Sequence, residues 1–149
     1  MRQYSITELL DSGLTDEALA AMLPPVVVEI AACVGIDAAL RLVRAVGGVA
    51  YDVPKGRQAH GQRSAREQRL IDAIGDEAAA AFMAVYGGDT LYIPSCKPLL
   101  LELRNRKFVR CVNQAITAGM SKKAAVQQFA YEFGFSDRHG RSLLKKYRG

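Results

Sequence analysis

Residues 121–147 read SKKAAVQQFAYEFGFSDRHGRSLLKKY, a stretch with the start and stop signals of two short helices joined by a tight turn. Ser121 and Ser136 are each expected to cap a helix, because a serine side chain at a helix start accepts a hydrogen bond from an unpaired backbone N–H group. Gly134 supplies the left-handed residue that ends a helix before such a turn. The stretch therefore predicts a helix-turn-helix, in which the helix after Ser136 is the recognition helix.

The segment around this stretch is strongly basic. Residues 97–149 hold twelve Lys and Arg against three Asp and Glu, a net charge of +9, whereas residues 1–96 hold eight against twelve, a net charge of −4. A further helix is expected from Pro98 to the break at Gly119, which makes the basic segment a three-helix unit. A basic module on an acidic body favours a polyanionic partner, so residues 97–149 are predicted to be a domain that binds double-stranded DNA.

A recognition helix in the major groove brings its first residues to the base edges. Arg138 and Arg141 are therefore expected to contact guanine, and the nearby lysines to contact phosphates, which position the protein without reading sequence. The predicted DNA contacts are Ser121, Lys122, Lys123, Ser136, Arg138, His139, Arg141, Ser142, Lys145 and Lys146. The alternative interpretation is a small helical bundle with an ordinary solvated basic face.

Gly140 departs from this pattern, because the recognition helix usually has a packing residue such as Val or Ile at this place. A glycine inside a helix costs about 1 kcal/mol relative to alanine, before any loss of packing. Two explanations stay open. Either the helix is loosely held until DNA orders it, or the close approach of another backbone excludes a side chain.

The acidic body contains an internal repeat, without gaps, at an offset of 40 residues. Residues 24–56 form the first copy and residues 64–96 the second. The shared residues are Gly35, Ala38, Ala39, Gly47, Gly48 and Pro54, which recur as Gly75, Ala78, Ala79, Gly87, Gly88 and Pro94. Each copy predicts two helices, a Gly-Gly break and a short strand, over 49–53 in one copy and 89–93 in the other. A lone strand needs a partner for its backbone groups, either its repeat mate or a second subunit.

The remaining segments are expected to have supporting roles. Residues 55–66 are polar, basic and glycine-containing, which is typical of an exposed linker. Residues 1–22 are expected to form one or two short amphipathic helices that cover the repeat core, with partner contact as the alternative. This segment has no signal-peptide pattern, and no apolar stretch is long enough to span a bilayer.

Catalysis has little support, so the chain is predicted not to be an enzyme. Its two histidines, His60 and His139, have no paired acids near them in sequence. The three cysteines, Cys33, Cys96 and Cys111, are widely spaced and odd in number, which indicates neither a zinc site nor a disulfide framework. No metal and no cofactor are expected, and a reduced, cytoplasmic protein is implied.

Several motifs resemble the Mor transcription activator family of Mu-like bacteriophages. They are Leu23-Pro24, Glu29-Ile30-Ala31, Val34-Gly35-Ile36, Ala38-Ala39-Leu40, Gly47-Gly48 before a strand ending at Pro54, the run from Tyr86 to Pro94 (YGGDTLYIP), and the run from Tyr131 to Ser136 (YEFGFS). The Gly-Gly to Tyr-Ile-Pro run directly upstream of a helix-turn-helix is fairly specific to the family, whereas a helix-turn-helix alone is not.

The resemblance implies a helical dimerisation region over residues 1–96, in which the strands of two subunits pair as an antiparallel β-ribbon. The implied fold is mainly α, with the two helix-helix-strand repeats followed by the C-terminal helix-turn-helix. It also implies a phage or prophage activator that recruits host RNA polymerase in the bacterial cytoplasm. By this resemblance, Tyr51, Tyr92, Ser95 and Lys97 are possible ribbon contacts to DNA.

The chain departs from the family in having two helix-helix-strand units before one helix-turn-helix. The strands therefore pair either within one chain, as an intramolecular pseudo-dimer, or between the chains of a homodimer. The alternative function is a protein-interaction module, or an inhibitor, that binds an activator or polymerase without reading DNA.

Overall fold

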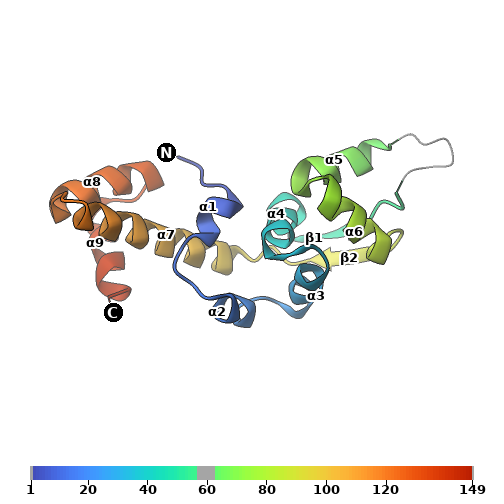
Figure 1. Ribbon diagram of the computed structural model, residues 1–149, viewed down its shortest axis with the longest axis horizontal. Helices are drawn as coiled ribbons and strands as arrows, with labels where there is room; N and C mark the ends of the chain where they lie inside the picture. The colour runs from blue at the N-terminus through green and yellow to red at the C-terminus, as the bar shows by residue number, and fades with distance from the viewer. Residues whose placement is uncertain (1, 57–62, 149) are drawn as a thin grey trace. The chain divides into compact units, whose positions relative to one another are not determined.

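The structure is a computed structural model that describes residues 2–56 and 63–148. In these ranges the chain forms nine helices and one two-stranded antiparallel sheet (Figure 1), so the prediction of a mainly helical fold with a short antiparallel ribbon is confirmed. The chain divides into two compact units. The ribbon unit comprises Glu17–Lys97, and the C-terminal unit comprises Met1–Asp16 together with Pro98–Gly149. Residues 57–62 of the predicted linker, including His60, lie outside the described residues.

The ribbon unit contains two segments with the same order of elements, each made of two helices followed by a strand. Its elements are α2 (Asp16–Ala21, with Asp16 belonging to the C-terminal unit), α3 (Pro25–Val34), α4 (Ile36–Val46), β1 (Val49–Asp52), α5 (Ala65–Ile74), α6 (Asp76–Tyr86) and β2 (Thr90–Ile93). α3 and α5 have 10 residues each, α4 and α6 have 11, and β1 and β2 have 4. The helices of each pair are separated by a glycine in the same conformation, Gly35 at φ 89° and Gly75 at φ 91°. A residue with a side chain rarely adopts this φ, which explains why both positions are glycine.

β1 and β2 pair with each other in the same chain, so the strand partner is the second segment of this molecule. Tyr51 lies opposite Leu91, and the antiparallel register runs from Val49 opposite Ile93 to Asp52 opposite Thr90. The strands begin and end within one residue of the predicted limits. The chain thus satisfies the backbone groups of its own ribbon without a second subunit.

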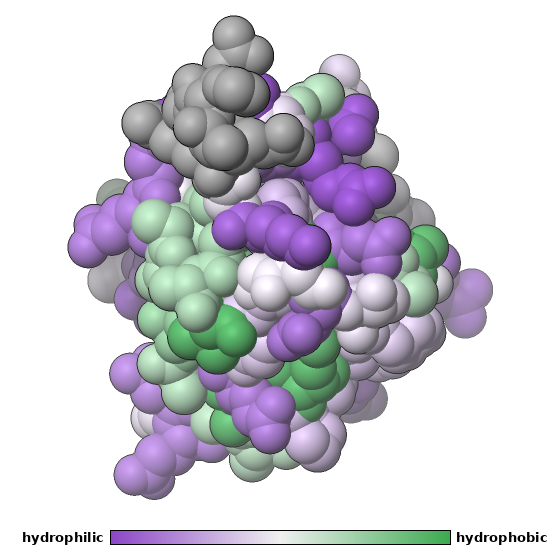
Figure 2. Space-filling model, turned by 90° about the vertical axis from the view of Figure 1, so that its right-hand side faces the viewer, coloured by the Kyte–Doolittle hydropathy of each residue, from purple (hydrophilic) through white to green (hydrophobic). Residues whose placement is uncertain are grey.

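The helices of the ribbon unit bury their apolar faces against one another. α3 contacts α4 and α6, and α5 contacts the same two helices. The largest fully buried side chains of this core are Val27, Ile30, Leu40, Leu42, Val43, Phe82 and Ile93. On the face shown in Figure 2, hydrophobic residues lie in small groups between hydrophilic ones. The large hydrophobic side chains that stay exposed in this unit are Met22, Val28, Val49, Val85 and Tyr92.

The C-terminal unit is built around an aromatic cluster. Its elements are α1 (Ile6–Leu10), α7 (Lys97–Thr117), α8 (Lys122–Phe133) and α9 (Asp137–Lys146), with Lys97 belonging to the ribbon unit. The ring of Phe108 lies 5.5 Å from that of Phe133 and 5.2 Å from that of Phe135, both edge-on. Tyr4 stacks on Phe133 at 4.5 Å. These rings join the N-terminal segment, α7 and the end of α8 into one core.

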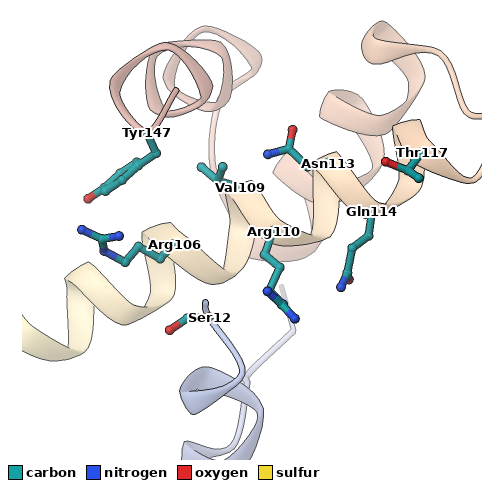
Figure 3. A pocket seen from close by; sticks show the side chains of 8 residues that line it. All are labelled: Ser12, Arg106, Val109, Arg110, Asn113, Gln114, Thr117 and Tyr147. Atoms are coloured by element: carbon teal, nitrogen blue, oxygen red, sulfur yellow. The ribbon is translucent and has the colours of Figure 1, made fainter. Parts of the chain in front are cut away.

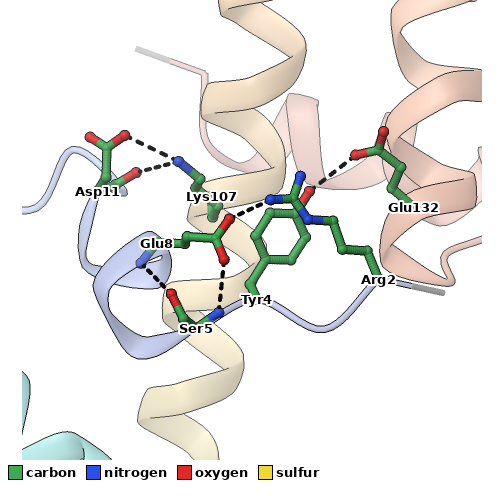
Figure 4. Close-up of polar contacts among 7 residues, drawn as sticks. All are labelled: Arg2, Tyr4, Ser5, Glu8, Asp11, Lys107 and Glu132. Atoms are coloured by element: carbon green, nitrogen blue, oxygen red, sulfur yellow. Dashed lines mark hydrogen bonds and ion pairs between the residues drawn. The ribbon is translucent and has the colours of Figure 1, made fainter.

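The expectation that residues 1–22 cover the repeat core is wrong for the first part of this segment. Figure 4 shows residues 2–11 lying along α7 and α8 instead. The backbone N–H of Arg2 donates to Glu132 O at 2.7 Å, and the Tyr4 hydroxyl donates to the Glu132 carboxylate at 3.1 Å. Lys107 Nζ lies 3.1 Å from Asp11 Oδ2. The acidic and aromatic side chains of this segment complement the basic, aromatic surface of α7, which accounts for its position.

Candidate nucleic-acid interface

The connection between α8 and α9 has the conformation that the sequence predicts. Gly134 adopts the left-handed conformation, with φ 73° and ψ 26°, and its N–H group bonds back to the last turn of α8. The N–H of Phe135 donates to Ala130 O at 2.8 Å, which satisfies another carbonyl at the helix end. Only two residues then separate Gly134 from Asp137, so α9 follows α8 across a tight turn.

Both predicted caps are formed. Ser121 Oγ accepts from the N–H of Ala124 at 3.1 Å, and Ser136 Oγ accepts from the N–H of His139 at 3.0 Å. Each hydroxyl keeps its proton, because a serine hydroxyl has one donor besides its acceptor lone pairs. The two serines can therefore hold the helix starts and still donate a hydrogen bond to an anionic oxygen.

The exposed face of α9 is basic. Arg138, Arg141, Ser142 and Lys145 recur at spacings of three and four residues, so they lie on one side of the helix, and all four are exposed. His139 is also exposed, with its ring edge-on to Phe135 at 4.8 Å. The opposite side of α9 faces the core through the following residues: Gly140 and Leu143, which are buried, and Leu144 and Tyr147, which are half-buried.

Gly140 is explained by a neighbouring side chain. A Cβ at this position would lie 2.9 Å from Phe108 Cζ and 3.4 Å from Val126 Cγ1. Of the two explanations left open by the sequence, close approach is the one realised, but the approaching group is an aromatic ring and not a backbone. Leu143 is 5 % exposed, so α9 also has an apolar anchor beside the glycine.

A hydrogen bond also holds the C-terminal end of α9 against α7. The Tyr147 hydroxyl donates to Glu102 Oε2 at 2.6 Å, and Arg106 Nε lies 3.0 Å from Glu102 Oε1. Both contacts lower the pKa of Glu102, and the hydrogen bond from Tyr147 has the larger effect. Desolvation of the carboxylate acts in the opposite direction. Burial, followed by the bond to Glu102, raises the pKa of Tyr147 to about 12. α9 is thus held near its middle and at its end.

The basic residues of the C-terminal unit fall into two groups. Those of α7 have partners within the unit: Arg104 donates to the carbonyl of Phe133, Arg106 pairs with Glu102, and Lys107 and Arg110 pair with Asp11. The hydrogen bond from Lys107 is the main cause that lowers the pKa of Asp11. The exposed basic residues of α8, α9 and the chain after α9 are Lys122, Lys123, Arg138, Arg141, Lys145, Lys146 and Arg148. The positive charge that is open to a partner is therefore concentrated on α8 and α9.

A groove of about 440 Å³ lies along α7 (Figure 3). Its lining residues are Ser12, Arg106, Val109, Arg110, Asn113, Gln114, Thr117 and Tyr147. The guanidinium of Arg106 stacks on the Tyr147 ring, at 4.9 Å from its centroid. Sequence reasoning did not single out Asn113, Gln114 or Thr117, because isolated polar residues on a helix carry no spacing signal.

The four possible ribbon contacts are not all on one surface. Tyr92 is 63 % exposed, whereas Tyr51 is half-buried and its burial raises the pKa of its hydroxyl. The two side chains point to opposite faces, because Tyr92 pairs with Ala50 and successive residues of a strand alternate. Ser95 is half-buried and Lys97 is exposed. Tyr51 therefore does not share the exposed face of Tyr92, as joint contact with DNA would require.

Residues 2–56 and 63–148 contain neither a metal-binding cluster nor a helix that could cross a membrane. Within these ranges, no group of three or more His, Cys, Asp and Glu side chains is arranged to hold a metal ion. The helices found there are all too short or too polar to cross a membrane.

Comparison with known proteins gives one match. Residues 59–149 match the model of the Mor transcription activator family. The matched part contains α5, α6, β2 and the helices α7, α8 and α9, and it leaves α3, α4 and β1 outside. No curated protein and no solved structure is significantly similar to the chain.

Proposed function

This chain belongs to the Mor transcription activator family, and we propose that it is a sequence-specific DNA-binding activator of phage or prophage genes. The proposed reading element is a helix-turn-helix formed by α8, the turn at residues 134–136, and α9. We further propose that it recruits host RNA polymerase in the bacterial cytoplasm, and that it has no enzymatic activity and needs no cofactor.

The observation that carries the DNA-binding proposal is the exposed basic face of α9. Arg138 and Arg141 lie one turn apart on this face, without a partner element covering them. An arginine side chain in the major groove can bond to guanine O6 and N7 at once, which gives specificity as well as affinity. Lys145 and Lys146 at the other end of α9, and Lys122 and Lys123 at the start of α8, fit phosphate contacts that set the position of the helix.

The groups beneath this face support the same proposal. The Phe108 ring against Gly140 and the Tyr147–Glu102 hydrogen bond hold α9 from the side opposite its exposed face. A reading helix fixed in this way pays little ordering cost when it enters a groove, which favours affinity. Arg106, Lys107 and Arg110 of α7 pair with acids of the same unit, so the positive field open to DNA in this unit comes mainly from α8 and α9.

The test is selection of bound fragments from random duplex DNA at near-physiological salt. The wild-type protein is compared with a double variant, Arg138→Ala with Arg141→Ala, and with a control variant, Arg66→Ala with Arg69→Ala. The control loses the same charge at exposed positions of α5 in the ribbon unit. We expect a sequence motif for the wild type and the control, and no motif for the Arg138, Arg141 variant.

Two outcomes would refute the proposal. A motif that the Arg138, Arg141 variant retains would mean that α9 does not read DNA. The absence of any enrichment, together with a stable complex with polymerase or another activator, would instead identify a protein-interaction module. Gly140 does not favour that module, because the ring of Phe108 accounts for the glycine in a firmly packed α9.

A further inference from the structure

We propose that the ribbon unit is a complete two-fold unit within a single chain, so that one molecule presents one α8–α9 pair and binds a single half-site without a partner subunit. The statement about the half-site rests on the proposed DNA binding. The statement about the ribbon unit rests on the structure of that unit alone.

The strand register is the first support for this inference. Tyr51 lies opposite Leu91, and these two positions differ by 40 residues, which is the offset of the sequence repeat. Exchanging the two copies therefore returns the same pair. The pairing of Val49 with Ile93 becomes, on exchange, a pairing of Asp89 with Val53, and the N–H of Val53 donates to Asp89 O at 2.9 Å. An isologous two-fold contact has this property.

The helix contacts obey the same exchange. Replacing α3, α4 by α5, α6 converts the α3–α6 contact into the α5–α4 contact, and both are present. The ends of the strands also correspond. A Cβ at Gly47 would lie 2.9 Å from Pro94 O, and a Cβ at Gly87 would lie 3.3 Å from Pro54 O. Strands, helices and strand ends thus share one approximate two-fold relation.

The family match covers only the second of the two helix-helix-strand segments. The match begins at residue 59 and contains one helix-helix-strand segment followed by α7, α8 and α9. The first segment, α3–α4–β1, lies before the match and is followed by α5, not by a second set of DNA-reading helices. We infer that this first segment takes the place that the same segment of a second chain would occupy in a two-fold assembly.

The side chains on the outer face of the ribbon differ between the two strands. Asp52 occupies the position that corresponds to Tyr92, and its carboxylate accepts from Thr90 Oγ1 at 2.6 Å. A carboxylate on this face repels phosphate, so half of the ribbon is unsuited to lie against DNA. The first copy thus keeps the positions that close the core but has an acid on the outer face. This arrangement fits a protein that engages DNA from one side only.

The first measurement is the mass of the full chain in solution, by light scattering over a wide range of concentration. We expect a monomer of 16.2 kDa at every concentration. The melting temperature should also be independent of protein concentration, because unfolding of a unit closed within one chain involves no dissociation. A dimer mass, or a melting temperature that rises over about a hundredfold increase in concentration, would overturn the inference.

The second measurement uses DNA. The motif selected by the wild-type protein is placed once, or twice as an inverted repeat, in otherwise identical duplexes. We expect one chain to bind the single motif, and two chains to bind the inverted repeat independently. Cooperative binding of two chains to the inverted repeat would contradict the half-site statement.

The two proposals fail in different ways. If the protein binds no DNA but remains a monomer with a concentration-independent melting temperature, the proposed function fails and the two-fold unit within one chain stands. If it binds DNA specifically as a dimer, the proposed function stands and this inference fails.

Discussion

The ring of Phe108 in α7 occupies the space that a side chain at position 140 in α9 would fill. A Cβ on Gly140 would lie 2.9 Å from Phe108 Cζ, a separation shorter than van der Waals contact. Phe108 is fully buried and meets the rings of Phe133 and Phe135. The ring therefore has little room to retreat. An aromatic residue on α7 has taken over the packing role that an aliphatic residue at position 140 would otherwise have.

Gly140→Val should destabilise the protein by about 2 kcal/mol, since it forces three carbon atoms against a ring that cannot move freely. The measurement is urea unfolding of the variant and of a control, Ser142→Val. The control introduces the same side chain on the exposed face of α9. Its change should stay within about 0.5 kcal/mol.

The same contact predicts a coupling between the two positions. In the double variant Gly140→Val, Phe108→Leu, the leucine is smaller than the phenylalanine ring and leaves room for the valine. The double variant should therefore be more stable than the sum of the two single free-energy changes predicts. Strict additivity of the two free energies would mean that Phe108 does not exclude a side chain at position 140.

Ser136→Ala should destabilise the protein by about 1 kcal/mol, because the N–H of His139 loses the oxygen that it donates to. Ser136→Asp keeps a capping oxygen and adds a negative charge at the helix start, so it should retain the stability of the wild type. If this end of α9 faces DNA, the same charge should weaken binding. Equal DNA affinity of Ser136→Asp and the wild type would place the start of α9 away from the phosphates.

Tyr147→Phe should lower stability by about 1 kcal/mol at neutral pH, the value of one hydrogen bond. The effect at high pH has a definite sign. The pKa of Tyr147 is raised from its usual value of 10 to about 12, chiefly by burial and then by the bond to Glu102. The neutral hydroxyl therefore contributes stability that is complete below pH 10 and is lost as the pH rises to about 12.

The decrease of the unfolding free energy with rising pH should be smaller in the Tyr147→Phe variant than in the wild type. Tyr4, whose pKa burial also raises to about 12, remains in both proteins and keeps part of the pH dependence. The control is Tyr131→Phe, since Tyr131 is 80 % exposed on α8. Unfolding free energies measured from neutral pH to about pH 12 decide the question, and identical slopes for Tyr147→Phe and the wild type would contradict it.

Much of the C-terminal unit could be predicted because its signals are local. The caps Ser121 and Ser136, and the left-handed Gly134, act within a few residues of themselves, so the limits of α8 and α9 follow from the sequence. The periodicity of α9 likewise predicts that Arg138 and Arg141 share its exposed face.

The features that the sequence could not predict depend on residues far apart in the chain. The Phe108–Gly140 contact joins α7 to α9, and the Tyr4–Phe133 stack joins the N-terminal segment to α8. No spacing rule relates such pairs. For the same reason the partner of β1 stayed open, because the repeat pattern is equally compatible with pairing inside one chain and between two chains.

Glu67→Met should stabilise the protein by about 1 to 2 kcal/mol. Glu67 is 3 % exposed, and its Oε2 has no hydrogen-bond partner among the described residues. The corresponding position of the first copy is Val27, which is fully buried. A methionine of similar length removes the cost of burying a poorly paired carboxyl group. Thermal unfolding measures the effect, and the control is Glu77→Met, at an exposed position of α6. A lower melting temperature for Glu67→Met would mean that this carboxyl has a stabilising partner.

Arg141→Ala and Lys123→Ala should weaken DNA binding in different ways. Both side chains are exposed, Arg141 on the basic face of α9 and Lys123 in the first turn of α8. Loss of an arginine that reads guanine should cost about 1 to 3 kcal/mol and relax the base preference at one position of the motif. Loss of a phosphate contact should weaken all sequences alike and reduce the salt dependence of log K by about one unit. Titrations of the selected motif and of its single-base variants at several salt concentrations separate the two effects. The reverse assignment, with base preference lost in Lys123→Ala, would show that α8 and not α9 reads the DNA.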